Sequence, residues 1–190
     1  MPRHADPELE GRILAAADSL WRRGGQKALT MRAVAKAART NTPAVYRRFR
    51  DREDLLRGLV RRTVARLRQQ FEAQHTLEEM AEAYVAFALS NPHEYQLFYT
   101  HGRLLTPKKE TRTKTPLREW RPNFALVEQA AAKELGGSPD DYTQMTLQLW
   151  SLLHGMAMLV LSKSVPEEHQ SDLRQACRAA VRALLANARK

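Results

Sequence analysis

The sequence predicts an all-α protein of about nine helices, in which a small three-helix N-terminal part is joined by a long helix to a larger helical part. Three observations support this fold class. Apolar residues recur at spacings of three and four along the chain, and runs that alternate apolar and polar residues are missing. Residues that begin or end helices, mainly Pro, Gly, Ser, Thr, Asn and Asp, separate the periodic segments.

The first helix is expected to begin near Pro7 and to end at Gly24 and Gly25. The fixed φ of proline suits a first helical turn, and the carboxylates of Glu8 and Glu10 are favourable there because the N-terminus of a helix is the positive end of its dipole. One apolar stripe runs along this helix, formed by Ile13, Leu14, Ala17, Leu20 and Trp21.

Two short helices follow the first one. Thr30 is the expected N-cap of the second helix and Asn41 that of the third, since each side chain can accept a backbone hydrogen bond. In the third helix Val45 and Phe49, four residues apart, form the buried face. Neither helix is long enough to be stable alone, so both must pack on the first helix. Three such helices, with a tight turn between the last two, make a helix-turn-helix unit. The inward residues of the second helix are Met31, Val34, Ala35 and Ala38.

A long fourth helix is expected after Asp51, its N-cap. Its apolar seam is Leu56, Val60, Val64, Leu67 and Phe71. Five more helices are expected at residues 76–90, 92–101, 117–136, 139–163 and 166–188, separated by breaks rich in proline and glycine. We therefore predict two domains, residues 1–52 and residues 53–190.

The positive charge is concentrated in the first third of the chain. The formal net charge is +10, and residues 1–70 carry 17 Lys or Arg against 7 Asp or Glu, whereas the remaining residues carry 14 of each kind. A small, arginine-rich unit of this sort is typical of nucleic-acid binding. The alternative is a solvated arginine surface that only supports the helices.

The segment LTMRAVAKAARTNTPAVYRRFRDREDLL carries a family resemblance. It has a Thr that opens the second helix, an alanine-rich second helix, a Tyr three residues before a Phe, and then a basic residue followed by acids and leucine. In this pattern it resembles the N-terminal DNA-binding domain of the TetR family of bacterial transcriptional regulators, over about residues 7–60. The residues on the family frame are Tyr46, Phe49, Arg52, Glu53 and Leu55.

The resemblance implies DNA contacts at named positions. Thr30 and Tyr46 would bind phosphates, and Arg52 would contact the DNA backbone at the start of the fourth helix. The residues that would face bases in the major groove are Arg32, Thr42, Pro43, Ala44 and Arg47. The alternative for Tyr46 is a place in the core, and Arg48 is also explained by general electrostatics. The full candidate set is Thr30, Arg32, Thr40, Asn41, Thr42, Pro43, Ala44, Tyr46, Arg47, Arg48 and Arg52.

Two positions depart from the family pattern. Arg39 and Thr40 stand in the turn where the family usually has Gly and Val, and Arg48 stands where it often has His. Either the turn differs locally from the family, or φ is positive there and Arg39 tolerates some backbone strain. Arg39 also adds a positive charge near the DNA.

The resemblance also implies ligand sensing and dimerisation in the C-terminal part. Trp150, His154 and Gly155 resemble a Trp-x-x-x-His-Gly feature of one group of these domains. The candidate ligand contacts are Tyr84, Phe87, Tyr95, Phe98, Tyr99, Trp120, Trp150 and His154, for which an ordinary helical core is the alternative. The candidate dimer contacts are Leu152, Met156, Leu159, Leu173, Cys177, Val181 and Leu184.

Other function classes find little support. Histidines lack metal-ligand spacing, no phosphate-binding glycine motif occurs, and we expect no catalytic residues, metal or cofactor. Cys177 is the only cysteine, which favours a reducing cytoplasm, and residues 145–161 are expected to form a buried helix rather than a membrane span.

The sequence therefore predicts a homodimeric repressor that binds a palindromic DNA operator and is released by a small-molecule inducer. Two alternatives stay open: a protein that binds DNA without sequence preference, and a small-molecule-binding protein or enzyme built on the C-terminal helices.

Overall fold

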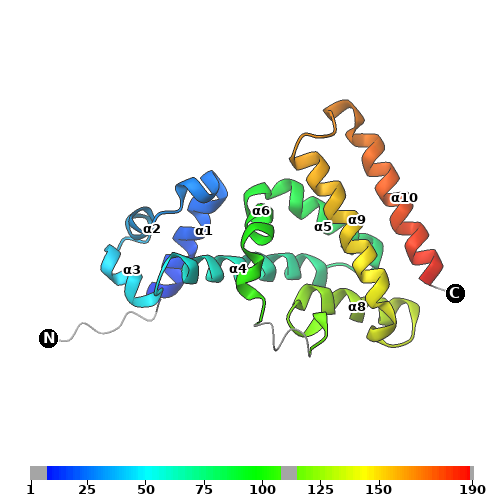
Figure 1. The fold of residues 1–190 in the computed structure, drawn as a ribbon, viewed down its shortest axis with the longest axis horizontal. Coiled ribbons are helices and arrows are strands. Elements are labelled where there is room, and N and C mark those ends of the chain that lie inside the picture. The colour runs from blue at the N-terminus through cyan, green and yellow to red at the C-terminus, as the bar shows by residue number, and fades with distance from the viewer. Residues whose placement is uncertain (1–7, 108–114, 189–190) are drawn as a thin grey trace. The chain divides into compact units, whose positions relative to one another are not determined.

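The structure is a computed structural model that describes residues 8–107 and 115–188. Within these ranges it contains nine α-helices and no strand, which confirms the all-α fold class (Figure 1). The chain forms two compact units. Unit 1 comprises Met1–Thr63 and His93–Thr106, and unit 2 comprises Val64–Pro92 and Pro107–Lys190. The long helix α4, Arg52–Glu72, contributes residues to both units. A functional division between residues 52 and 53 stays a prediction.

Unit 1 contains the expected helix-turn-helix. Its elements are α1 (Leu9–Ala28), α2 (Met31–Ala37), α3 (Thr42–Arg48), the first part of α4, α6 (Pro92–His101) and the 3-10 helix η1 (Gly102–Leu105). Side chains begin α2, α3 and α4 at the positions expected from sequence. The cap bonds run from Ala33 N–H to Thr30 Oγ1 (3.1 Å), from Ala44 N–H to Asn41 Oδ1 (2.9 Å) and from Asp54 N–H to Asp51 Oδ1 (2.7 Å).

The regular part of helix α1 ends at its glycine pair, as expected from sequence. Gly25 interrupts the helix with a φ of 57° and a ψ of −145°, and helical structure then resumes as far as Ala28. Glycine is needed for two reasons, since φ is positive and a β-carbon would lie 3.2 Å from His93 Nδ1. The expected break at Gly24 and Gly25 is therefore confirmed, with a short helical piece added after it, and Pro7 lies outside the described residues.

The core of unit 1 holds the two short helices in place. Val34 of α2 and Val45 of α3 are fully buried, together with Leu55 and Val60 from the first half of α4. Each buried aliphatic side chain of this size contributes about 1.5 to 3 kcal/mol relative to exposure. This burial supplies the stability that helices of seven residues lack by themselves.

Helix α6 belongs to unit 1 although it is remote from α1 in sequence. Trp21 Nε1 donates a hydrogen bond of 2.6 Å to the His93 carbonyl oxygen. The guanidinium of the next residue, Arg22, lies 2.7 Å from Glu94 Oε1 and 3.0 Å from Asp18 Oδ2. Glu94 is 1% exposed and Asp18 6%, so Arg22 compensates two buried carboxylates and ties α6 to α1.

Unit 2 is built around the apolar helix α9. Its elements are α5 (Leu77–Ser90), the 3-10 helix η2 (Leu117–Glu119), α8 (Pro122–Leu135), η3 (Pro139–Tyr142), α9 (Thr143–Leu161), η4 (Glu167–His169), α10 (Gln170–Ala188) and the end of α4. The buried side chains of α9 include Leu149, Leu153 and Met156. Thr76 and Glu79 form a capping box at the start of α5. No helix in the described ranges is long and apolar enough to cross a membrane.

A buried ion pair joins the elements of unit 2. Glu128 of α8 is 1% exposed, and its carboxylate lies 3.0 Å from Arg118 Nε and accepts a hydrogen bond of 2.6 Å from Thr143 Oγ1. Arg118 also pairs with Asp140. Proline explains why the helix expected at 117–136 is divided into η2 and α8: the residue before proline avoids the α region, and Arg121 has φ −125° and ψ 81°.

Replacing Arg22 with alanine is expected to destabilise unit 1 by about 1 to 3 kcal/mol, because it removes a half-exposed cation shared by two buried carboxylates. Urea unfolding followed by circular dichroism measures the change. The matched control is Arg23→Ala, since the Arg23 side chain is exposed and bonds only the Ser19 carbonyl within the described contacts. Equal midpoints for the two variants would contradict this assignment.

Candidate nucleic-acid interface

Helix α3 exposes one face and buries the other. Tyr46 is 49% exposed, Pro43 and Arg47 are also exposed, and Val45 is fully buried. Tyr46 is the only large hydrophobic side chain exposed in the described part of unit 1. A proline at the first or second position of α3 costs no helical hydrogen bond, because those N–H groups have no partner within the helix. The N-terminal turn of α3 is thus open to an incoming partner.

Ala44 does not lie on this open face. It is 4% exposed, and its N–H donates to the cap Asn41. Ala44 is adjacent to Val45 on a seven-residue helix, and the face that packs into unit 1 is wide enough to include both. The expectation that Ala44 faces bases is therefore wrong. Thr42, at the first position of α3, is half-buried.

Helix α2 adds cations that the sequence analysis partly missed. Thr30 and Arg32 are exposed, as expected for DNA contacts, and Lys36 is exposed one turn after Arg32. Lys36 was not among the candidates. Its spacing of four residues from Arg32 is the sequence signal that could have identified it.

Arg39 occupies a left-handed position in the turn between α2 and α3. Its φ is 55°, and the Thr40 N–H bonds the Ala35 carbonyl while the Arg39 N–H bonds the Lys36 carbonyl. These two bonds define a Schellman motif, in which glycine is the usual residue at the left-handed position. Of the two alternatives stated for this turn, the structure has the positive φ with a non-glycine residue. The Arg39 side chain is exposed.

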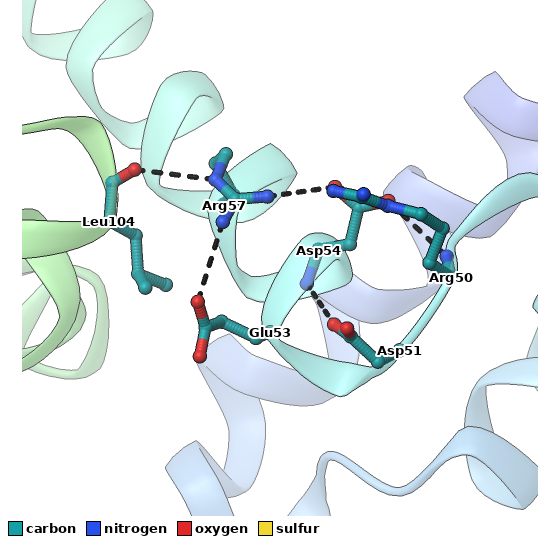
Figure 2. A network of polar contacts seen from close by, with 6 residues as sticks. All are labelled: Arg50, Asp51, Glu53, Asp54, Arg57 and Leu104. Carbon is teal, nitrogen blue, oxygen red and sulfur yellow. Dashed lines mark hydrogen bonds and ion pairs between the residues drawn. The ribbon is translucent and has the colours of Figure 1, made fainter. Parts of the chain in front are cut away.

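A polar network fixes the first turn of α4, where Arg52 stands (Figure 2). The guanidinium of Arg57 bonds Asp54 Oδ1 at 3.0 Å and Glu53 Oε1 at 3.4 Å, and its Nε donates to the Leu104 carbonyl in η1 at 3.3 Å. The Arg50 N–H donates to Asp54 Oδ2 at 3.3 Å. Together with the Asp51 cap, these contacts hold the chain on both sides of the half-buried Arg52.

The remaining candidates surround the same helices. Asn41 is exposed, and Thr40 and Arg48 are half-buried. Arg47 makes no ion pair within the described residues, whereas Arg48 has a partner in the fold. An exposed, uncommitted arginine beside Tyr46 is suited to bind a base edge or a phosphate, since a guanidinium can donate two parallel hydrogen bonds.

The candidate ligand residues are divided between the two units. Tyr95, Phe98 and Tyr99 belong to unit 1, where the Tyr95 and Tyr99 ring centroids are 4.7 Å apart. Tyr84 and Phe87 are buried in unit 2, with Tyr84 stacked on Phe71 at 6.5 Å. Tyr84 and Phe87 therefore take the alternative expected for them, a place in the helical core, and a ligand role for the other aromatics stays a prediction.

A smaller group of these candidates does come together in unit 2. The Arg121 guanidinium lies 5.0 Å from the Trp120 ring centroid and 6.0 Å from that of Trp150. Trp150 also meets Phe124 edge to face at 6.4 Å. His154, one turn after Trp150, is half-buried, and burial lowers the pKa of its imidazole.

The candidate dimer residues fall into two groups. Met156, Cys177 and Val181 are buried within unit 2, so their assignment to an open dimer face is wrong: the same apolar stripe packs α10 against its own chain. Leu152, Leu173 and Leu184 are half-buried, and Leu159 is exposed. Met158, which was not among the candidates, is exposed beside Leu159.

No metal site is evident in residues 8–107 and 115–188, where no group of three or more His, Cys, Asp or Glu side chains could hold an ion. The arrangement of unit 1, with an open α3, exposed cations and braced helix starts, is that of a helix-turn-helix DNA-binding unit.

Comparison with protein families gives the identity of both parts. Residues 13–59 match the family model described as bacterial regulatory proteins, tetR family, and residues 77–184 match the model described as tetracyclin repressor-like, C-terminal domain. The chain belongs to the TetR family of transcriptional regulators. This assignment places it among DNA-binding regulators rather than enzymes. None of the curated proteins matches the chain.

Solved structures share the fold over nearly the whole chain. A protein of unknown function from Rhodococcus sp. RHA1 is similar with a TM-score of 0.69 and 23% identity, covering 98% of each chain. A TetR-family transcriptional regulator from Streptomyces coelicolor has a TM-score of 0.64 and 20% identity, covering 95% of this chain and 99% of its own. A TetR variant from Acinetobacter baumannii AYE, in complex with minocycline, has a TM-score of 0.62 and 20% identity, covering 96% of each chain.

Replacing Arg39 with glycine is expected to raise the free energy of unfolding by about 0.5 to 1 kcal/mol, because relief of a left-handed β-carbon exceeds the entropy that glycine loses on folding. Chemical denaturation measures the gain. Arg39→Gln is the matched control, since it removes the same charge and keeps the β-carbon. If the glycine and glutamine variants unfold at the same denaturant concentration, the turn is not strained.

Proposed function

We propose that this protein is a homodimeric, cytoplasmic repressor that binds a palindromic operator through α3 and is released from it by a small-molecule ligand. The observation that carries the DNA part is the open face of α3, which presents Pro43, Tyr46 and Arg47 while Val45 is buried. In a helix-turn-helix the second helix enters the major groove with its N-terminal side chains against the bases.

The position of each residue decides whether we assign it to a phosphate contact or to a base contact. Thr30, Tyr46 and Arg52 bind phosphates and set the register of the protein on the duplex. Thr42, Pro43 and Arg47 face base edges, with Arg32 beside them on α2. Ala44 is left out because it is buried. The positive charges of Lys36 and Arg39 attract the DNA phosphates whatever the base sequence.

Dimerisation is supported by the apolar surface of α9. Met158 is 42% exposed and Leu159 41%, and they are the only large hydrophobic side chains exposed in the described part of unit 2. A β-carbon built on Gly155, one turn earlier, would meet nothing within 4 Å, so a second helix can approach closely there. We propose that this part of α9 and the Leu173 and Leu184 side of α10 meet their counterparts in a second copy.

Two observations support the ligand part of the proposal: a similar structure contains a bound small molecule, and several candidate ligand residues lie together in unit 2. The similar structure from Acinetobacter baumannii is a complex with minocycline. In this chain Trp120, Trp150 and His154 remain the ligand candidates, since Arg121 brings both tryptophans together. Ligand binding would release DNA by favouring a dimer in which the two α3 helices no longer match successive major grooves, roughly 34 to 36 Å apart.

Selection of bound DNA from a random pool tests the operator proposal. The wild-type chain is expected to select a palindrome. Arg47→Ala is expected to cost about 1 to 3 kcal/mol and to relax preference at one base position in each half-site, because it removes a base contact. Arg52→Ala is expected to weaken all sites alike and to reduce the slope of log affinity against log salt by about one for each phosphate that is no longer neutralised.

Arg61→Ala serves as the control for removal of one exposed arginine from the same unit. A wild-type chain that protects DNA uniformly, with no discrete palindromes in footprinting, would favour the alternative of binding without sequence preference.

Leu159→Glu is expected to raise the dimer dissociation constant at least about a hundredfold, because two-fold symmetry places two uncompensated carboxylates in the apolar contact and each costs several kcal/mol. Sedimentation velocity measures the change, and circular dichroism checks that the helices remain. Gln129→Glu, on the exposed side of α8, is the matched control. A variant that stays dimeric would place the interface elsewhere.

A further inference from the structure

A second binding region lies in unit 2, away from the aromatic candidates. It is a groove of about 700 Å³ whose walls are α5 and α10 and whose floor includes Leu153 and Met156 of α9. None of the eight aromatic or histidine candidates for ligand contact lines it. Its volume is within the range of small-molecule sites, about 300 to 1,000 Å³.

Ion pairs bridge the two walls at regular intervals. Glu78 of α5 lies 2.6 Å from Arg182 of α10, and Glu82 lies 3.1 Å from Arg178. The acids are four residues apart on α5 and the arginines are four residues apart on α10, in the opposite order. The two helices therefore run antiparallel along the groove, with one ion pair for each turn.

The next pair in this register lacks its acid. Four residues beyond Glu82 stands Ala86, and four residues before Arg178 stands Arg174. Both line the groove, and the exposed side chain of Arg174 makes no ion pair or hydrogen bond within the described residues. Arg174 is therefore a cation opposite an alanine.

The other charges of the groove are compensated. Glu78 and Glu82 have their arginines, and Glu79 accepts hydrogen bonds from the His75 and Thr76 N–H groups at 2.8 and 3.1 Å. Those backbone bonds hold the pKa of the Glu79 carboxyl below its usual value, so it stays ionised and committed to the helix start. Arg174 is the one charge of the described groove lining without a partner.

Beside Arg174 the groove is mostly apolar. Val85 and Leu89 of α5 and Leu153 and Met156 of α9 line it, and Ser90 is a polar but uncharged neighbour. An occupant that complements this lining needs one negative group for Arg174 and a hydrocarbon body for the rest. A neutral molecule would leave the guanidinium to water, and a cation would be repelled by it.

We propose that the α5–α10 groove binds a small apolar carboxylate, whose anionic group takes the place opposite Arg174 that the missing acid leaves open. The carboxylate accepts two hydrogen bonds from the guanidinium, and the hydrocarbon body covers Val85 and Leu89. This site is additional to the DNA-binding function and does not depend on it.

Calorimetric titration of the full chain with octanoate, octanol and octylamine tests the proposal, because the three share one hydrocarbon length and differ in charge. Octanoate is expected to bind most tightly and octylammonium least. The affinity for octanoate is expected to fall as salt is raised, whereas that for octanol is not.

Two variants act on the same charge in different ways. Arg174→Gln removes the cation, and Ala86→Glu supplies the absent acid on α5. Each is expected to weaken octanoate binding about threefold to tenfold, to the level of octanol, while leaving octanol binding unchanged. Lys133→Gln, which removes one exposed charge from α8, is the matched control and is expected to change neither.

The proposal is overturned if octanol binds as tightly as octanoate, if octanoate binding survives both variants at full strength, or if none of the three probes binds saturably. No DNA is present in the titration, so these results are separate from any failure of operator binding.

Discussion

Helices α2 and α3 are each seven residues long, and the rest of unit 1 depends on how such short helices are made stable. An isolated helix of this length does not persist in water. Here the side chains of Thr30 and Asn41 satisfy backbone donors at the two starts, and Val34 and Val45 are fully buried. The same burial fixes which side of α3 faces outward. Structural stability and exposure of the DNA-binding face therefore have one physical cause.

Each unit also contains a carboxylate that is almost completely buried beside an arginine from another element. Glu94 of α6 meets Arg22 of α1, and Glu128 of α8 meets Arg118 of η2. Pairs of this kind add little net stability compared with apolar packing, because both charges lose water. Removing one partner is costly, so these pairs fix which elements lie together. In unit 1 the consequence is that α6 and the helix-turn-helix form one compact body.

Few large apolar side chains are exposed on the described surface. Large apolar side chains are exposed at only three positions of the described ranges, one on α3 and two on α9. An exposed Tyr46 beside Arg47 suits a nucleic acid, whereas adjacent Met158 and Leu159 suit a second copy of the chain. The α5–α10 groove, in which the side chain of Arg174 has no ion-pair partner, is a third surface and is suited to a small anion. These three surfaces connect the fold of a TetR-family regulator with the partners proposed for it.

Local chemistry made most of the fold predictable from sequence. The caps at Thr30, Asn41 and Asp51 and the breaks at Pro92 and Pro139 act within a few residues, so helix positions and the helix-turn-helix could be predicted. Packing between residues that are distant in the sequence could not be predicted in this way. Only the tertiary structure placed α6 in unit 1 and buried Ala44 and Val181. Helical periodicity specifies which residues share a face, but the element that covers that face is decided by the whole chain.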